Sequence, residues 1–156
     1  EDISAGEDSA LFETQWGKIG SLICFDSIYE ELARDSVRDG AVLLALPTND
    51  SWFSDSAAVY MHNNHDKFRA LENGRYLVRS ANTGVSSIIA PDGRELGRQE
   101  ALTTGLVVAD VCVRDCQTPY TAVGYLLVWI SLGVQILLAL THLIWRILGK
   151  KRLNNS

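Results

Sequence analysis

The chain has 156 residues, the length of one ordinary domain, and 47% of its residues are hydrophobic. Its formal net charge is −5, but four basic residues near the C-terminus contribute +4, which leaves −9 on the rest of the chain. An acidic domain of this kind argues against nucleic acid as a partner.

The first recognisable unit is a strand followed by a helix. Residues 18–25 (KIGSLICF) form an apolar run bounded by Gly and Asp, which predicts a buried strand. Ser27 and Glu30 have the S-x-x-E spacing of a capping box, so we expect a helix over residues 28–39 that ends at Gly40.

A second buried strand is predicted over residues 41–46, ended by Pro47. A strand, a helix and a strand in this order form a βαβ unit, whose two strands are parallel. Loops that leave the carboxyl ends of parallel strands meet at one edge of the sheet, where ligands bind in open α/β folds. Two loops should meet there, one with Cys24, Phe25 and Asp26 and the other with Asn49, Asp50 and Trp52.

Further elements extend this unit into an α/β domain. A helix capped by Asp55 or Ser56 is expected to run to Asn73, with Gly74 as its stop. The remaining predicted strands cover residues 76–81, 85–90 and 106–111, of which the first two form an antiparallel pair.

The C-terminal region has the composition of a membrane span. Residues 124–145 contain no Asp, Glu, Lys or Arg, over a length close to the ~20 residues that cross a bilayer. Tyr125 and Trp145 lie near its two ends, as aromatic side chains at membrane interfaces do. We predict a transmembrane helix rather than a core helix. The basic residues of the segment 146–152 favour a cytoplasmic C-terminus and an outer location for the preceding domain.

The three cysteines are Cys24, Cys112 and Cys116. Outside the cytoplasm Cys112 and Cys116 could form a local disulfide, but so short a loop strains the bond geometry, and both alternatives stay open. No His or further Cys lies at metal-ligand spacing from them, so zinc is not expected. No cofactor is expected either.

Cys24 is the candidate nucleophile. A thiol at the end of a buried strand, next to the start of a helix, has its thiolate favoured by the helix dipole. By position alone an inert buried cysteine is an equal alternative, since free cysteines are among the most buried residues. His62, His65 and His142 all lie on predicted helices, so no general base is evident. Asn49 and Asp50 could form only an Asx-turn, but Trp52 beside them favours a site.

The segment GKIGSLICFDSIYEELARDSVRDGAVLLALPTNDSWF resembles the nucleophile region of the nitrilase superfamily, also called carbon-nitrogen hydrolases. NDSWF, the following His62, RALENGRYLVRSANTG and TPYTAVGY with its apolar helix are more particular. Together they resemble bacterial apolipoprotein N-acyltransferases.

This resemblance implies a nitrilase-like αββα sandwich on the extracytoplasmic side of the bacterial inner membrane, in a multi-pass protein. Residues 1–118 would be the C-terminal part of that domain, residues 119–148 the final transmembrane helix with its lead-in, and residues 149–156 a basic cytoplasmic tail. It also implies a Glu-Lys-Cys triad, of which the chain contains only Cys24, with Glu and Lys expected upstream. The implied reaction moves a phospholipid acyl chain through a thioester to a diacylglyceryl-cysteine lipoprotein.

Some positions depart from the family pattern. Cys24-Phe25-Asp26 replaces the usual Cys-Tyr-Glu, Trp52-Phe53-Ser54 replaces Trp-Phe-Gly, and Ala58-Val59 replaces Gly-Pro. We expect Cys24 to be catalytic, with Phe25, Asp26, Asn49, Asp50 and Trp52 in supporting or substrate-binding roles. Two other interpretations remain: a membrane-tethered amidase or nitrilase, or a truncated remnant without catalysis. Arg69, Glu72, Arg75 and Arg79 could bind a headgroup, but a solvated helix face or a Glu72–Arg75 ion pair is favoured for most of them.

Overall fold

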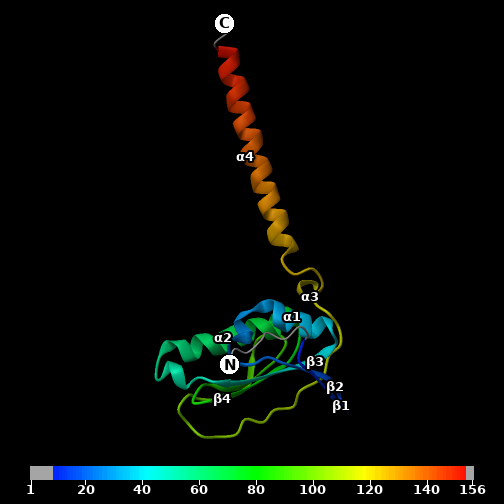
Figure 1. The fold of residues 1–156 in the computed structure, drawn as a ribbon, viewed down its shortest axis with the longest axis vertical. Coiled ribbons are helices and arrows are strands. Elements are labelled where there is room, and N and C mark those ends of the chain that lie inside the picture. Colours follow the sequence, from blue (N-terminus) through cyan, green and yellow to red (C-terminus); the bar gives the residue numbers. More distant parts are fainter. Residues whose placement is uncertain (1–8, 154–156) are drawn as a thin grey trace, which may run out of the picture. The chain divides into compact units, whose positions relative to one another are not determined.

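The computed structural model describes residues 9–153, without the side chains of residues 127 and 146–153. It forms two compact units, divided between Ala122 and Val123 (Figure 1). The first unit is an α/β domain and the second is a helix, and each is described by itself. The predicted basic tail, residues 149–156, lies entirely outside the described side chains.

A single six-stranded sheet organises the first unit, with its strands side by side in chain order. β3 is parallel to both β2 and β4, and the other pairs are antiparallel. The predicted βαβ unit and the antiparallel pair β4–β5 are therefore confirmed. The strands are β1 (Leu11–Thr14), β2 (Gly17–Ser21), β3 (Ala41–Asn49), β4 (Leu77–Asn82), β5 (Ser86–Ile89) and β6 (Glu95–Gln99).

The prediction that Pro47 ends β3 is wrong, because the strand continues to Asn49. Leu44 N–H donates toward β4, to Tyr76 O, whereas Ala45 O accepts from Leu22 N–H on the β2 side. Since backbone groups alternate between the two sides of a strand, Pro47 faces the β2 side. β2 has already ended at Ser21, so no ladder bond requires the missing N–H of Pro47.

Helices α1 (Glu30–Arg38) and α2 (Ala57–Asn73) lie on one face of the sheet (Figure 1). Between them and the sheet is the apolar core, which includes Leu22, Leu44 and Leu77. α2 begins at its predicted cap Ser56 and ends at Gly74, whose φ of 62° is left-handed. The predicted Ser27 cap is wrong: Ser27 lies within a short 3-10 helix, η1 (Cys24–Ile28), and the residue that precedes α1 is Tyr29.

The predicted strand over residues 106–111 is also wrong, and β6, which the sequence did not predict, occupies the edge of the sheet. The segment instead runs without a strand ladder along the face opposite the helices. Val107 packs against Gly97, and Arg114 N–H donates to Val42 O. Its alternating valines are apolar because they contact the sheet face, not because they lie in a strand.

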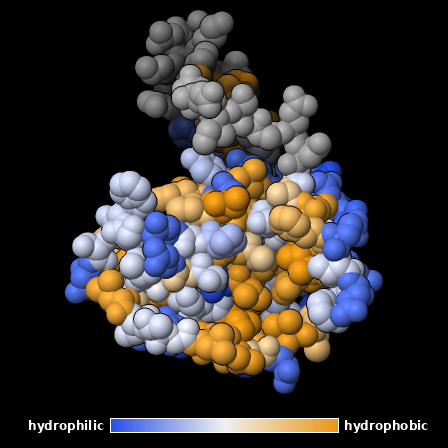
Figure 2. All heavy atoms as spheres, turned by 60° about the horizontal axis from the view of Figure 1, so that its bottom comes forward, coloured by the Kyte–Doolittle hydropathy of each residue, from blue (hydrophilic) through white to orange (hydrophobic). Residues whose placement is uncertain are grey.

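That second face of the sheet is apolar and only partly covered. Phe12, Ile19 and Leu43 lie side by side on it by register, and Phe12 is 61% exposed. Figure 2, turned toward this side, shows hydrophobic side chains gathered across it. A cavity of about 360 Å³ lies here, lined by Thr14, Trp16, Ile19, Val42, Leu43, Val111 and Val113.

A short helix, α3 (Pro119–Val123), joins the α/β unit through Thr121, whose hydroxyl donates to Asn73 Oδ1. The second unit is dominated by α4 (Leu126–Leu153). Its segment Val128–Trp145 is long and apolar enough, by length and composition, to cross a membrane, and its side chains are exposed.

Candidate active site

The backbone makes a sharp turn at Cys24. β2 ends at Ser21, four residues earlier than predicted, and Cys24 has a left-handed φ of 54°. Such a conformation is uncommon for a residue with a side chain and occurs often at functional sites. Asp26 stabilises the turn, because its Oδ2 accepts a 2.8 Å hydrogen bond from Ile23 N–H. Cys24 itself is half-buried and unpaired.

The second predicted loop brings a buried carboxylate to the same place. Asp50 is 1% exposed, and Thr48 donates to its Oδ1 at 3.1 Å. Burial opposes the negative charge of Asp50, but the hydrogen bond to His62 and the positive charge of Arg79 outweigh it, so the pKa of Asp50 is lowered.

His62, on α2, joins the two loops. Its Nδ1 lies 2.9 Å from Asp50 Oδ1, and its Nε2 lies 3.2 Å from the carbonyl oxygen of Cys24. The imidazole also stacks on the ring of Phe25, with 5.2 Å between centroids, and Phe53 contacts both rings edge-on. The convergence of the two loops, expected from topology alone, is therefore observed, with a histidine between them.

Behind His62, Arg79 bridges two buried carboxylates. Its Nη2 lies 2.5 Å from Asp50 Oδ2 and its Nη1 lies 2.6 Å from Asp66 Oδ2, while its Nε donates to Val85 O. Asp66 is completely buried, and desolvation raises its pKa despite the charge of Arg79. Gly84 makes this packing possible, because a Cβ there would overlap Asp50.

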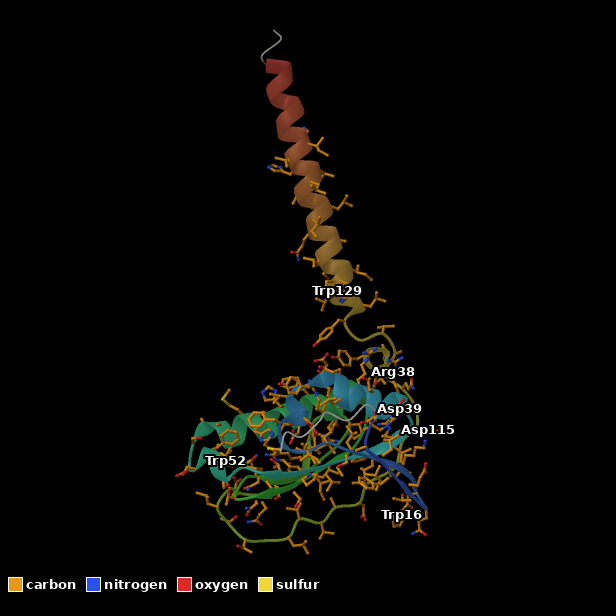
Figure 3. All side chains as sticks on the ribbon, viewed as in Figure 1. Trp16, Arg38, Asp39, Trp52, Asp115 and Trp129 are labelled. Carbon is orange, nitrogen blue, oxygen red and sulfur yellow. The ribbon has the colours of Figure 1, made fainter. Side chains whose placement is uncertain are left out.

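The other predicted site residues have less central positions. Asn49 forms the Asx contact with Ser51 N–H and accepts a hydrogen bond from Asn82. Trp52 is 87% exposed at the periphery of the α/β unit (Figure 3). Ser54, where the resembled family has glycine, has φ 52° and ψ −139°, a conformation that side chains strongly disfavour.

The expected Glu72–Arg75 ion pair and the solvated helix face are wrong. Glu72 pairs with Arg69 at 2.8 Å, and Arg75 is buried and donates instead to carbonyl oxygens, including those of Ala41 and Cys116. Arg69, Arg75 and Arg79 are all at most 6% exposed, which excludes a solvated face. Buried carbonyl groups outside the strand ladders and helices need hydrogen-bond donors, and one arginine side chain supplies several N–H donors.

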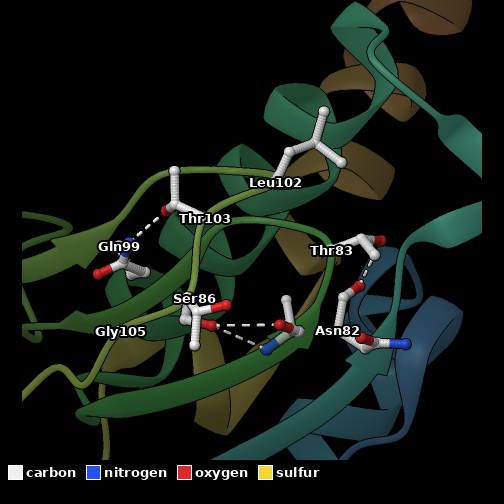
Figure 4. Close-up of a pocket in the computed structure, with 9 residues that line it drawn as sticks. Asn82, Thr83, Ser86, Gln99, Leu102, Thr103 and Gly105 are labelled. Atoms are coloured by element: carbon white, nitrogen blue, oxygen red, sulfur yellow. Dashed lines mark hydrogen bonds between the residues drawn. The ribbon is translucent and has the colours of Figure 1, made fainter.

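A separate polar cavity of about 390 Å³ lies beyond the end of β4 (Figure 4). Its walls carry hydroxyl and amide groups without charge, including Asn82, Thr83, Ser86, Gln99 and Thr103. Several of these groups bond to one another, as Gln99 does to Thr103.

Cys112 and Cys116 are both free and exposed, so the alternative of a local disulfide is not realised. Among the described residues no group of His, Cys, Asp and Glu could hold a metal ion.

Reasoning from the sequence gave Asp66 no site role, used His62 only in the family resemblance, and considered Arg79 only as a disfavoured headgroup ligand. A usable signal existed, because Arg79 lies in a predicted strand at a position that alternation turns toward the helices, where a charge requires a partner. His62, Asp66 and Arg69 are likewise spaced to share one face of α2.

Comparison with curated proteins finds relatives over most of the chain. A protein from Geobacter metallireducens named apolipoprotein N-acyltransferase is 39% identical over 128 residues, which is 82% of this chain and 25% of the relative. A protein of the same name from Thermosynechococcus vestitus is 33% identical over 141 residues, 90% of this chain and 28% of the relative. The chain thus spans about a quarter of the length of these relatives.

Solved structures show the same fold at lower identity. The amidase NitN from Nesterenkonia sp. AN1 superposes with a TM-score of 0.61 at 24% identity, over 72% of this chain and 46% of that one. A mutant of the Nesterenkonia amidase, with acrylamide added at its active-site cysteine, gives a TM-score of 0.60 at 23% identity, over 70% and 45% of the two chains. The six-stranded sheet and its helices are thus part of a nitrilase-like α/β fold. The family model of the carbon-nitrogen hydrolases matches residues 3–119, and the chain belongs to this family.

Proposed function

We propose that this chain is the C-terminal part of an enzyme that N-acylates the diacylglyceryl-cysteine of lipoproteins, with Cys24 as the acyl-carrying nucleophile. The observation that carries the proposal is the similarity, at 39% identity over 82% of the chain, to a protein named apolipoprotein N-acyltransferase. The geometry at Cys24 supports it, because a strained turn at the end of a strand lies beside a buried polar network.

The proposed reaction has two steps. The Cys24 thiolate attacks the ester carbonyl of a phospholipid, and the ester C–O bond breaks to release the lysophospholipid alcohol, which takes up a proton. The resulting thioester is reactive enough for attack by the α-amine of the lipoprotein. In that second step the C–S bond breaks, the thiolate is regenerated, and the amine loses a proton to a general base as the amide forms.

Residues of this chain would support both steps. Asp26 holds the turn at Cys24, and Asp50 holds His62 against the Cys24 carbonyl. The rings of Phe25 and Phe53 pack over His62 and would help to exclude water, which competes with the amine for the thioester. Trp52, whose side chain is exposed, would contact a lipid substrate rather than stabilise the fold.

The rest of the machinery is proposed to lie in the longer protein. A glutamate as general base and a lysine that stabilises the oxyanion would come from the part that precedes this chain. For that reason the 156-residue chain alone should be inactive. The apolar helix α4 fits a multi-pass protein of the bacterial cytoplasmic membrane, with the α/β unit on its outer side, where phospholipid donor and lipoprotein acceptor are both available.

The test uses the complete protein in phospholipid vesicles. The acyl adduct on the wild-type enzyme should be released by hydroxylamine, as thioesters are, and should be absent from Cys24→Ala. Cys112→Ala is the matched control, because it removes an exposed thiol outside the site. Persistence of the adduct in Cys24→Ala would contradict the proposal, as would acyl transfer by the 156-residue chain alone.

A second candidate, a membrane-tethered amidase, is favoured by the structural similarity to Nesterenkonia amidases. Cys24 would again form an acyl-enzyme, but from a small amide, and water would release the acid. Ammonia and free acid should then appear from small amides in the absence of phospholipid. The N-acyltransferase predicts neither product.

A further inference from the structure

α2 buries a polar stripe instead of an apolar one. His62, Asp66, Arg69 and Asn73 are spaced to share one helix face, and each is at most 6% exposed. Two of them donate to the turn of the nucleophile: His62 to Cys24 O, and Arg69 to Ser27 O at 3.4 Å. Buried polar groups need partners, so this face of α2 and the turn η1 specify each other's conformation.

The two ring nitrogens of His62 both face acceptors. Nε2 lies 3.2 Å from Cys24 O, and a carbonyl oxygen can only accept, so Nε2 carries a proton. Nδ1 lies 2.9 Å from Asp50, which accepts because its pKa is lowered and it is ionised. Arg79 Nη2 is also 3.2 Å from Nδ1, but it lies 2.5 Å from Asp50 Oδ2, so both donors converge on the carboxylate. With the carbonyl on one side and the ionised carboxylate on the other, this arrangement favours a proton on each ring nitrogen.

Charge supports the same conclusion. The groups that face His62 are Asp50 at the end of β3, Arg79 on β4 and Asp66 on α2, together with the uncharged rings of Phe25 and Phe53. The four charged or titratable side chains of this cluster are at most 3% exposed. Burial raises the pKa of Asp66, but wherever both carboxylates are ionised a neutral histidine would leave them to share one guanidinium, and the net negative charge in a buried place is costly. An imidazolium makes the cluster neutral.

The geometry points to His62 as a positioning residue for the nucleophile: an imidazolium, held by Asp50, that fixes the left-handed backbone of Cys24 through its carbonyl and brings a positive charge to the backbone of the nucleophile. This inference rests on the proposed role of Cys24. Its two parts are separable, because a hydrogen bond to the carbonyl orients the side chain, whereas the positive charge favours the thiolate.

Two variants in the complete protein separate these effects. His62→Phe keeps a flat ring beside Phe25 but has neither donor nor charge, whereas His62→Gln keeps an amide donor without charge. His65→Gln is the matched control, one turn along the same helix, with no site contact among those described for the fold. A variant is counted as folded when its thermal unfolding transition and its circular dichroism spectrum match those of the wild type.

The first readout is alkylation of Cys24 by iodoacetamide, followed by mass spectrometry of its peptide, and it requires no acyl chemistry. At pH 7 we expect the rate to fall roughly tenfold in both His62 variants. At pH 10, where an ordinary thiol is ionised anyway, His62→Gln should come within about threefold of wild type and His62→Phe should remain slower. Equal rates in wild type, His62→Gln and His62→Phe would overturn the inference.

The second readout is acyl transfer, where kcat should fall about 10–100-fold in His62→Phe with KM within about twofold, as expected when a supporting group is lost. His62→Gln should recover part of kcat.

A third readout uses the wild type: ¹⁵N NMR of histidine-labelled protein, with the His62 signals assigned by their loss in His62→Gln, should show both nitrogens protonated at pH 7. A neutral ring there would overturn the inference. If Cys24→Ala kept its acyl adduct, the proposed function would fail, while the alkylation and NMR results would still decide the role of His62.

Discussion

Replacing Arg79 with methionine should strongly destabilise the α/β unit. Arg79 is 2% exposed and contacts Asp50, Asp66 and Val85 O. In Arg79→Met, Asp50 keeps His62, but Asp66 loses the only ion pair that the described residues give it. Removing one partner of a buried ion pair commonly lowers the free energy of unfolding by about 3–5 kcal/mol, and we expect a loss of this size for Arg79→Met.

Protonation of Asp66 sets an upper limit to this cost. A carboxyl group with an unfolded pKa of about 3.9 can be neutralised at pH 7 for about 4 kcal/mol, and at pH 5 for about 1.5 kcal/mol. Because the pKa of Asp66 in the variant would lie above its unfolded value, the penalty is present above the folded pKa and disappears as the pH falls below the unfolded one. The destabilisation should therefore shrink by more than half between pH 7 and pH 5.

Thermal unfolding of the complete protein in detergent, followed by tryptophan fluorescence, measures this. A loss of 4 kcal/mol corresponds to a Tm lower by roughly 8–16 °C for a domain of this size. Arg38→Met is the control, since Arg38 pairs with Asp35 at the surface and should contribute no more than about 1 kcal/mol. A Tm for Arg79→Met no lower than that of the control, or a penalty independent of pH, would refute the reasoning.

Three further predictions follow from the site. Asp50→Asn should be less stable than wild type above pH 4, and the difference in stability should shrink as the pH falls. The reason is that the lowered pKa of Asp50 stabilises the fold only where the carboxyl is ionised. Equal differences in stability at pH 3 and pH 7, measured by thermal unfolding, would contradict this. Ser54→Gly should raise stability by about 1–3 kcal/mol by removing a strained backbone, measured as an increase in Tm, and a decrease would count against the strain. Trp52→Ala should change stability by less than about 0.5 kcal/mol, so a fall in acyl transfer with unchanged Tm would place Trp52 on the substrate side, and a large fall in Tm would exclude that role.

The sequence alone determined most of the α/β framework. Apolar runs bounded by Gly and Asp located β2 and β3, and their βαβ connection predicted parallel strands whose loops meet at one edge. Ser56 and Gly74 mark the two ends of α2, because serine favours the extended N-cap conformation and glycine favours the left-handed C-cap conformation. These features are decided by short stretches of chain, so a single sequence can reveal them. The prediction for residues 106–111 failed because alternation of apolar residues shows only that one side of the segment is buried. A strand has that property, but so does an irregular segment packed on the face of a sheet.

The site itself depended on contacts between distant residues. The sequence identified Cys24 and Asp50 as neighbours by topology, but not the side chain between them. His62 reaches Asp50 across 12 positions and Cys24 across 38, while Arg79 reaches Asp50 across 29. No local pattern encodes a buried charge cluster, because each member is tolerated only when the others neutralise it. Tertiary structure therefore decided the polar face of α2 and the partners of its arginines, since both depend on which charges and carbonyl groups meet out of reach of water.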